Sequence, residues 1–383
     1  SGLLPIQQWY FESDEKNISH FNQSVLLSID KSISREDIRS AVKQIMSQHD
    51  ALRFEYKNHD GNWVQEYGSN IGELITVDLK SASEETLSNL IKVEADKVQR
   101  SMNIEKGDIA KFVLIETPDS QTHNRIFIVV HHLAIDGVSW RIILDDLEIL
   151  LTKISNGDKP ELGVKSNSYR QWFKALEEYG QSKRALTQRI YWEKADSGFE
   201  PIKTDKPFSG KVTSKDVESQ RLKLDSKLTQ LLLQEVPKVY HTEINDILLC
   251  ALALTICEYG NSEKIVIGLE GHGREDINES IDTSRTVGWF TSLYPLMLEL
   301  KSGINLSDSI KSIKEQIRKI PDKGLGYGVL KYINKVEKLS GQSNWDIVFN
   351  YLGQIDNVVS SGKLLSGAGE SGGSGTSEDH EIN

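Results

Sequence analysis

The chain has 383 residues, of which 38% are hydrophobic and 26% charged, and its formal net charge at pH 7 is −11. This length exceeds what one hydrophobic core usually serves, so we expect two subdomains of an ordinary globular protein. The acidic balance argues against a nucleic-acid partner, and no stretch approaches the roughly 20 consecutive apolar residues of a membrane span. Because no secretion signal opens the chain, we expect a cytoplasmic protein with no membrane partner.

Helices and strands alternate in the first half of the chain. Ser34 precedes apolar residues at helical spacing and predicts a capped helix. The turn sequence 59–61 separates two short runs rich in aromatic residues, which predicts a hairpin. Ser81 and Glu84 match a capping box before the next helix. Further strands are expected at 111–115 and 126–130, and further helices at 138–152, 168–179 and 183–195.

The second half is expected to repeat this style. The predicted strands are 221–224, 264–269, 294–298 and 346–349, and the predicted helices are 226–236, 243–259 (capped by Thr242) and 307–320. Neither a Rossmann nor a phosphate-binding-loop signature accompanies the alternation, so the predicted class is α/β with mixed sheets. Residues 360–378 are rich in glycine and serine, a composition typical of a flexible loop or linker.

Two adjacent histidines, His131 and His132, stand where a strand is expected to end and a turn to begin. The turn is signalled by Asp136 and Gly137, which complete an HHxxxDG motif. Histidine exchanges protons near neutral pH, so the pair is a candidate acid–base site, although such a pair can also simply satisfy buried backbone groups. Neighbouring residues on a strand point to opposite faces, so only one ring can enter such a site, and the sequence alone does not choose between them.

A second candidate proton-transfer group, Glu270, lies at the expected end of strand 264–269. Burial would raise the pKa of its carboxyl toward the range useful for acid–base work. Asp136 is expected to pair with Arg274 and fix the turn rather than to act in catalysis. Asn350 and Tyr351 end another strand, where they either donate hydrogen bonds to a developing negative charge or satisfy the strand end.

Six further segments accompany the HHxxxDG motif in a characteristic order. They are 5–11 (PIQQWYF), 245–249 (NDILL), 270–275 (EGHGRE), 285–291 (RTVGWFT), 324–328 (GLGYG) and 349–354 (FNYLGQ). With HHxxxDG, this set resembles the condensation-domain superfamily of nonribosomal peptide synthetases, and within it the epimerization branch. The resemblance spans nearly the whole chain.

The resemblance implies two chloramphenicol-acetyltransferase-like lobes, each with a mixed sheet and flanking helices, arranged as a V around a central tunnel. We expect residues 1–180 to form the N-terminal lobe, 181–215 the connection, and 216–383 a C-terminal lobe that is incomplete at its end and contains the Gly/Ser-rich segment. The family assigns the second histidine, His132, to the tunnel. His131 is then expected to support the fold.

The resemblance also implies an isomerase that equilibrates L and D configurations at Cα of an aminoacyl or peptidyl thioester. His132 and Glu270 would move the protons without a bound cofactor or metal, and Asn350 and Tyr351 would contact the enolate. The thioester would arrive on the 4′-phosphopantetheine arm of an upstream peptidyl carrier protein. An adenylation domain of the same synthetase and a downstream condensation domain would be the other partners in antibiotic biosynthesis.

Two alternatives share this fold. A condensation domain would use the histidine to position an amine for attack on a thioester, and a catalytically silent domain would only dock partner proteins. Glu270 discriminates against condensation, because amide formation needs no second acid–base carboxylate there. Retention of His132 and Asp136 argues against a silent domain.

Overall fold

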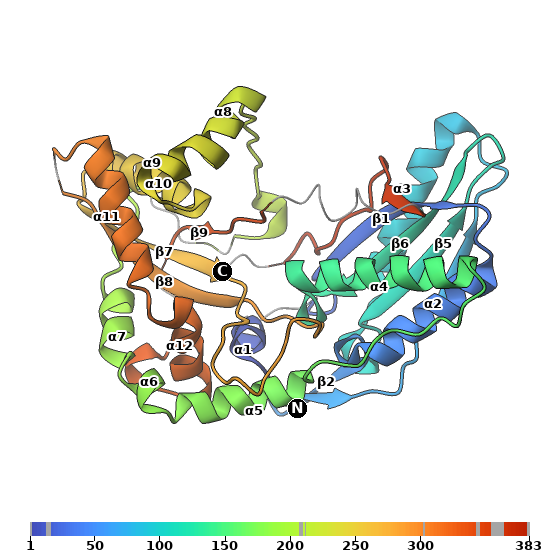
Figure 1. Cartoon of the computed structure of the whole chain (residues 1–383), viewed down its shortest axis with the longest axis horizontal. Helices are drawn as coiled ribbons and strands as arrows, with labels where there is room; N and C mark the ends of the chain where they lie inside the picture. Colours follow the sequence, from blue (N-terminus) through green and yellow to red (C-terminus); the bar gives the residue numbers. More distant parts are fainter. Residues whose placement is uncertain are drawn as a thin grey trace.

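The computed structural model describes residues 2–12, 17–206, 210, 212–301, 303–341, 345–353 and 364–380. Two lobes diverge from a shared base, so that the molecule has the expected V shape (Figure 1). Helix α5 (Tyr169–Gly180) runs along that base from one lobe to the other.

The first lobe is built on a five-stranded sheet. Its strands, in spatial order, are β10 (Leu365–Gly367), β1 (Asn22–Asp30), β6 (His123–His131), β5 (Ala110–Glu116) and β4 (Leu74–Asp78). All pairs are antiparallel except β4 with β5. Every residue of β6 from Arg125 to His131 is buried, because helices cover both faces of the sheet.

Three helices provide that cover. α2 (Arg35–Gln48) and α4 (Gly137–Ser155) pack on one face, and α3 (Glu84–Arg100) packs on the other. The capping box predicted at Ser34 is present, whereas α3 is capped at Ser83 rather than at Ser81. The predicted hairpin is confirmed as β2 (Phe54–His59) and β3 (Asn62–Tyr67).

The second lobe contains a smaller sheet. Its strands, in spatial order, are β8 (Ser292–Glu299), β7 (Lys264–Gly271) and β9 (Val348–Phe349). The helices packed around it are α7 (Arg189–Ser197), α10 (Ile244–Gly260), α11 (Leu306–Arg318) and the short α12 (Leu325–Gly328). Glu243, rather than the predicted Thr242, caps α10.

Two local predictions in this part of the chain are wrong, and a third, the helix at 226–236, is confirmed but extends further. Residues 221–224 do not form a strand: they pair with no strand in the described part of the chain, and Leu222 and Leu224 are exposed. The helix predicted at 183–195 is broken into α6 (Lys183–Leu186) and α7. The helix predicted at 226–236 is continued past a π-helical turn by α9 (Val236–Tyr240), after α8 (Ser226–Gln230).

No single helix in the described part of the chain is long and apolar enough to cross a membrane. The bent pair formed by α8–α9 and α10 passes the same test of length and composition only when taken together.

The Gly/Ser-rich segment is the largest departure from the prediction. Residues 360–363 lie outside the described residues, but 364–380 are not a flexible part of the second lobe. They lie along the edge of the first lobe's sheet, where β10 pairs with β1 and Glu370 forms an ion pair with Arg125. Glycine suits this path, because a Cβ on Gly375 would stand 2.4 Å from the carbonyl oxygen of Asn22.

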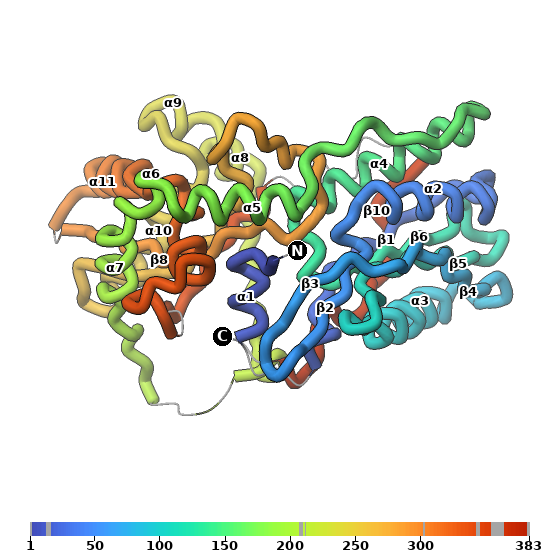
Figure 2. Tube along the Cα trace, turned by 90° about the horizontal axis from the view of Figure 1, so that it is seen from below, coloured from blue at the N-terminus to red at the C-terminus, as the bar shows by residue number. Residues whose placement is uncertain are grey.

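Helix α1 (Pro5–Glu12) links the two lobes (Figure 2). The buried amide of Gln7 donates to Tyr56 Oη, to Gln65 Oε1 and to the carbonyl oxygen of Leu133, all in the first lobe. The other end of the helix contacts the second lobe, where Tyr332 donates to Glu12. The first segment of the resemblance, 5–11, therefore forms a structural tie between the lobes.

A second tie, which we call the clasp, joins Asp136 and Arg274. Asp136 caps α4 through the backbone N–H of Ser139, accepts the N–H of Phe290, and pairs with the Arg274 guanidinium at 3.2 Å. Arg274 also donates to the carbonyl oxygens of Thr283 and Thr286. The two paired side chains are each only 6% exposed, so the pairing predicted from the sequence is confirmed as a buried ion pair between the lobes.

We expect Asp136→Asn to destabilise the domain by about 3–5 kcal/mol, because it leaves the Arg274 charge buried without its counter-ion. Asparagine caps helices as well as aspartate does, so the substitution separates the ion pair from the cap. Urea denaturation measures the effect. The control is Glu315→Gln, which breaks the exposed pair with Arg318 and should change stability by less than about 1 kcal/mol. Equal, small losses in both variants would contradict the role of the clasp.

Candidate acid–base site

His132 begins the short 3₁₀ turn η3 (His132–Ala134), immediately after β6. Its backbone N–H donates to the carbonyl oxygen of Phe21, so the turn is fixed to the start of β1. The imidazole contacts two aromatic rings, that of Phe21 at 5.1 Å and that of Trp289 at 4.2 Å between centroids. Trp289 belongs to the loop that the clasp holds against α4, so both lobes contribute to the surroundings of this ring.

The hydrogen bonds of His132 define its charge state. Nδ1 lies 2.9 Å from the carbonyl oxygen of Ile135, which can only accept, so Nδ1 carries a hydrogen. Nε2 lies 2.9 Å from Nε2 of Gln23. Burial lowers the pKa of the imidazole below its ordinary value, partly offset by the bond to Ile135 and by the charge of Asp136. The ring is therefore neutral at neutral pH, and part of the residue remains accessible to solvent.

His131 has a different environment. It is completely buried, its Nε2 donates to the carbonyl oxygen of Ile18 at 2.8 Å, and its Nδ1 accepts the backbone N–H of Leu133. Burial lowers its pKa to about 3. Both ring nitrogens are thus occupied by backbone groups, which leaves no atom of His131 for proton exchange with a ligand.

Glu270 lies near the end of β7 in the second lobe, half-buried. Its Oε2 accepts a hydrogen bond from the Asn350 amide at 2.5 Å. Burial raises the pKa of the carboxyl, and the bond from Asn350 acts in the opposite direction. Asn350 thus contacts Glu270 itself, while Tyr351 follows it half-buried. Glu270 bonds to Asn350, whereas His132 bonds to Gln23 and Ile135, so these contacts share no residue.

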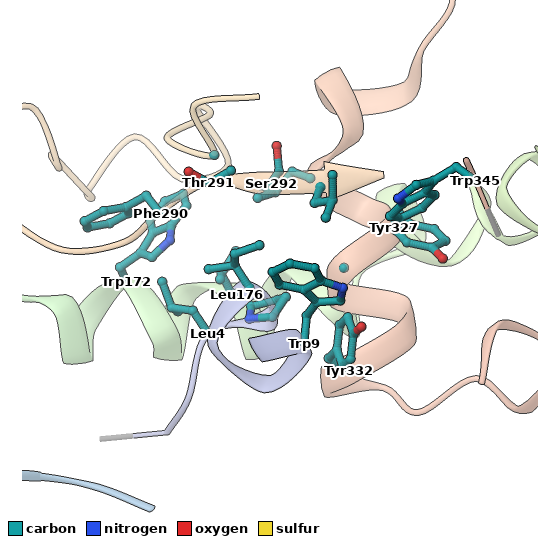
Figure 3. A pocket seen from close by; sticks show the side chains of 16 residues that line it. Leu4, Trp9, Trp172, Leu176, Phe290, Thr291, Ser292, Tyr327, Tyr332 and Trp345 are labelled. Carbon is teal, nitrogen blue, oxygen red and sulfur yellow. The ribbon is translucent and has the colours of Figure 1, made fainter. Parts of the chain in front are cut away.

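An apolar pocket lies beside the start of β8, the strand that pairs with β7 (Figure 3). Leu293, one of its lining residues, lies opposite Glu270 in the β7–β8 ladder, so the two side chains share a face of the sheet. Other residues that line the pocket are Leu4, Trp9, Trp172, Leu176, Phe290, Tyr327, Tyr332 and Trp345. They come from α1, α5, the clasped loop, α12 and the residues around it, so the pocket lies where the lobes meet.

Sequence reasoning proposed His132 and Glu270 as site residues, and it missed the residues that surround His132. Gln23, Phe21 and Trp140 were not proposed, and Trp289 was not expected beside the ring. Gln23 lies on β1 and Phe21 immediately precedes it, and the sequence analysis did not predict this strand. Among the described residues, no group of three or more His, Cys, Asp or Glu side chains is arranged to hold a metal ion. The chemistry open to this site is proton transfer by a neutral imidazole and a carboxyl of raised pKa.

Comparison with known proteins gives a consistent assignment. The family model for the condensation domain matches residues 2–375. Bacitracin synthase 3 of Bacillus licheniformis is 35% identical over 99% of this chain, which covers 6% of that protein. Surfactin synthase subunit 2 of Bacillus subtilis (strain 168) is 39% identical over 93% of this chain, which covers 10% of it. The chain thus spans only a small part of these curated relatives.

Solved structures agree. The epimerization domain from the third module of tyrocidine synthetase B superposes with a TM-score of 0.89 at 32% identity, covering all of this chain and 85% of that one. The first condensation domain of the calcium-dependent antibiotic synthetase superposes with a TM-score of 0.69 at 15% identity, covering 93% of this chain and 82% of that one, a likeness that shows the fold alone. The chain belongs to the condensation-domain family of nonribosomal peptide synthetases, and it has the two-lobed fold of that family.

Proposed function

We propose that this domain epimerises Cα of an aminoacyl or peptidyl thioester tethered to a carrier protein. The observation that carries the proposal is the pair of environments just described. Burial favours the neutral form of both candidate groups, so His132 can accept a proton while Glu270 can give one. The similarity to the epimerization domain of tyrocidine synthetase B, at twice the identity of the condensation domain above, supports the same reading.

The proposed reaction conserves protons and electrons. His132 Nε2 takes the Cα proton, and the electron pair of the broken C–H bond remains in the thioester enolate. Glu270 gives its carboxyl proton to the opposite face of Cα, which inverts the configuration and leaves a carboxylate. Transfer of the proton from the imidazolium to that carboxylate, directly or through water, restores both groups. The reverse direction exchanges their roles.

The thioester makes this chemistry accessible because it acidifies the Cα proton relative to an amide or an ester. The enolate still needs stabilisation, and we propose that the polar ends of Asn350 and Tyr351 contribute to it. The substrate would be delivered by the 4′-phosphopantetheine arm of an upstream peptidyl carrier protein in the cytoplasm. The adenylation domain of the same synthetase would load that carrier, and a downstream condensation domain would select the D product.

We expect His132→Ala and Glu270→Gln each to slow epimerisation by about 10²–10⁴-fold, because each removes one proton-transfer group. The measurement is conversion of an L-aminoacyl thioester on its carrier protein to the D isomer, with uptake of solvent deuterium at Cα followed in parallel. The two are separated because a variant that keeps His132 can still exchange the Cα proton of the L isomer without inverting it. Matched controls are His59→Ala and Glu279→Gln, both exposed. Wild-type domain should reach the same D/L ratio from either isomer. Amide formation with an acceptor carrier and no deuterium uptake would instead support condensation, and neither activity would support a silent domain.

Asn350→Ala should move the limb of the pH–rate profile governed by Glu270 to higher pH. The amide hydrogen bond stabilises the carboxylate, so its loss raises the pKa of Glu270 further. The test is deuterium uptake from the D-aminoacyl thioester, the direction in which Glu270 must be ionised, with the exposed Asn278→Ala as control. An unchanged profile would show that Asn350 does not control this carboxyl.

For His131 we propose a structural role, testable through the pH dependence of stability. The folded state keeps the imidazole neutral down to a pKa of about 3, whereas the unfolded chain takes up a proton near pH 6.5. Stability should therefore fall as the pH decreases below about 6.5, by about 2 kcal/mol at pH 5 from this group alone. His131→Gln should be less stable at pH 7 but lose that dependence, while the exposed His59→Gln keeps it. The same pH dependence in His131→Gln and wild type would refute the assignment.

A further inference from the structure

Gln23 lies on β1, and Phe21 lies immediately before that strand, two residues earlier in extended backbone, so both side chains lie on the face that meets His132. Phe21 contacts the imidazole through its ring, and the Gln23 amide reaches Nε2 of the imidazole at 2.9 Å. The pairing of β1 with β6 sets this geometry, because Gln23 lies opposite Val130, close to the end of the strand that leads into His132.

Trp140 decides which way the Gln23 amide points. The indole Nε1 of Trp140 can only donate, and it lies 2.7 Å from Oε1 of Gln23. The amide oxygen is thereby committed to Trp140, and the amide nitrogen is the group that faces His132. An amide nitrogen donates and does not accept, so Nε2 of His132 must be the acceptor in this bond.

The contact of the second ring nitrogen, Nδ1, indicates the same tautomer independently. Nδ1 of His132 faces the carbonyl oxygen of Ile135, so the hydrogen of the neutral ring is on Nδ1. The three hydrogen bonds are therefore consistent with one another: Trp140 donates to Gln23, Gln23 donates to His132, and His132 donates to the carbonyl oxygen of Ile135. They allow one tautomer of the neutral ring and leave the lone pair on Nε2.

A protonated His132 does not fit this series of hydrogen bonds. The imidazolium carries hydrogen on both nitrogens, so Nε2–H would face the N–H of Gln23. Rotation of the amide by half a turn would turn its oxygen toward the imidazolium, but its nitrogen would then face the N–H of Trp140. One of the two contacts always joins donor to donor, and an unsatisfied donor at a part-buried site is costly.

We propose that Gln23, oriented by Trp140, is a positioning residue that holds His132 as the neutral Nδ1–H tautomer with Nε2 poised to accept a proton. The amide must then release Nε2 as the Cα proton arrives, so each turnover breaks the Gln23–His132 bond. The role of Nε2 as the base rests on the proposed function, whereas the tautomer and the charge state do not.

Other titratable groups near the ring are the same in every variant below. Asp136 at the N-terminus of α4 favours the imidazolium, and His131 at the end of β6 lies beside it. His20 precedes Phe21, and His380 of the C-terminal segment stacks on Phe21 at 4.8 Å. A shift confined to changes at Gln23 or Trp140 therefore reports on the chain of hydrogen bonds.

The test compares wild type with Gln23→Glu and Trp140→Phe in the full chain labelled with ¹⁵N-histidine. In wild type, the ¹⁵N spectrum should show His132 protonated at Nδ1 only. Gln23→Glu offers an oxygen to both neighbours, so the titration midpoint of His132 should rise by about one pH unit or more. Trp140→Phe frees the amide to rotate without adding a charge and should also raise the midpoint, by a smaller amount. Gln8→Glu, which adds the same charge elsewhere on the chain, is the control.

The acid limb of the deuterium-uptake profile should move to higher pH with the midpoint in both variants, because uptake needs the neutral ring. A wild-type ring protonated at Nε2, or midpoints unchanged in both variants, would overturn the inference. A correct tautomer and shifted midpoints in a domain that takes up no deuterium would instead retain the inference about Gln23 and reject the proposed function. A melting curve for each variant separates these outcomes from unfolding.

Discussion

The candidate site depends on one buried ion pair. Asp136 of the HHxxxDG motif caps α4 in the first lobe, while Arg274 belongs to the loop that leaves β7 in the second. Their contact and the bond from the Phe290 N–H to Asp136 fix the loop that places Trp289 against His132. A buried pair of this kind stabilises the fold little in net terms, but it strongly penalises any arrangement that separates its members. It therefore specifies how the two lobes meet rather than how tightly each folds.

Burial acts in opposite senses on the two candidate groups, and this gives them complementary roles. It disfavours charge on any side chain, which means a lower pKa for an imidazole and a higher pKa for a carboxyl. The pKa of the His132 imidazole is thereby lowered and that of the Glu270 carboxyl raised, which is the combination that the proposed reaction requires. No strong partner charge is needed, and local hydrogen bonds only adjust the result. His131 shows the limit of the same effect, where complete burial with both nitrogens bonded to the backbone removes proton exchange altogether.

The sequence predicted local structure well. The capping box at Ser34, the hairpin at 59–61 and the strand before His131 follow from neighbouring residues, and all three are present. The strand expected at 221–224 alternates correctly but has no partner, and pairing is not encoded in the strand itself. The Gly/Ser-rich composition of 360–378 suggested flexibility, yet small residues are also what its described part, from 364 onward, needs to lie close against the backbone of β1. Gln23 was missed because its contacts depend on two distant segments, β6 and α4.

The origins of these contacts bear on how the site works. His132 is surrounded by Gln23, Phe21 and Ile135 from its own lobe, and by Trp289 from a loop that is clasped to that lobe. Glu270 is bonded to Asn350, whose strand pairs with its own. Each group's affinity for protons is therefore set within one side of the molecule. A movement of the second lobe's sheet against the first lobe would change the distance between the two groups and leave both pKa values nearly unchanged.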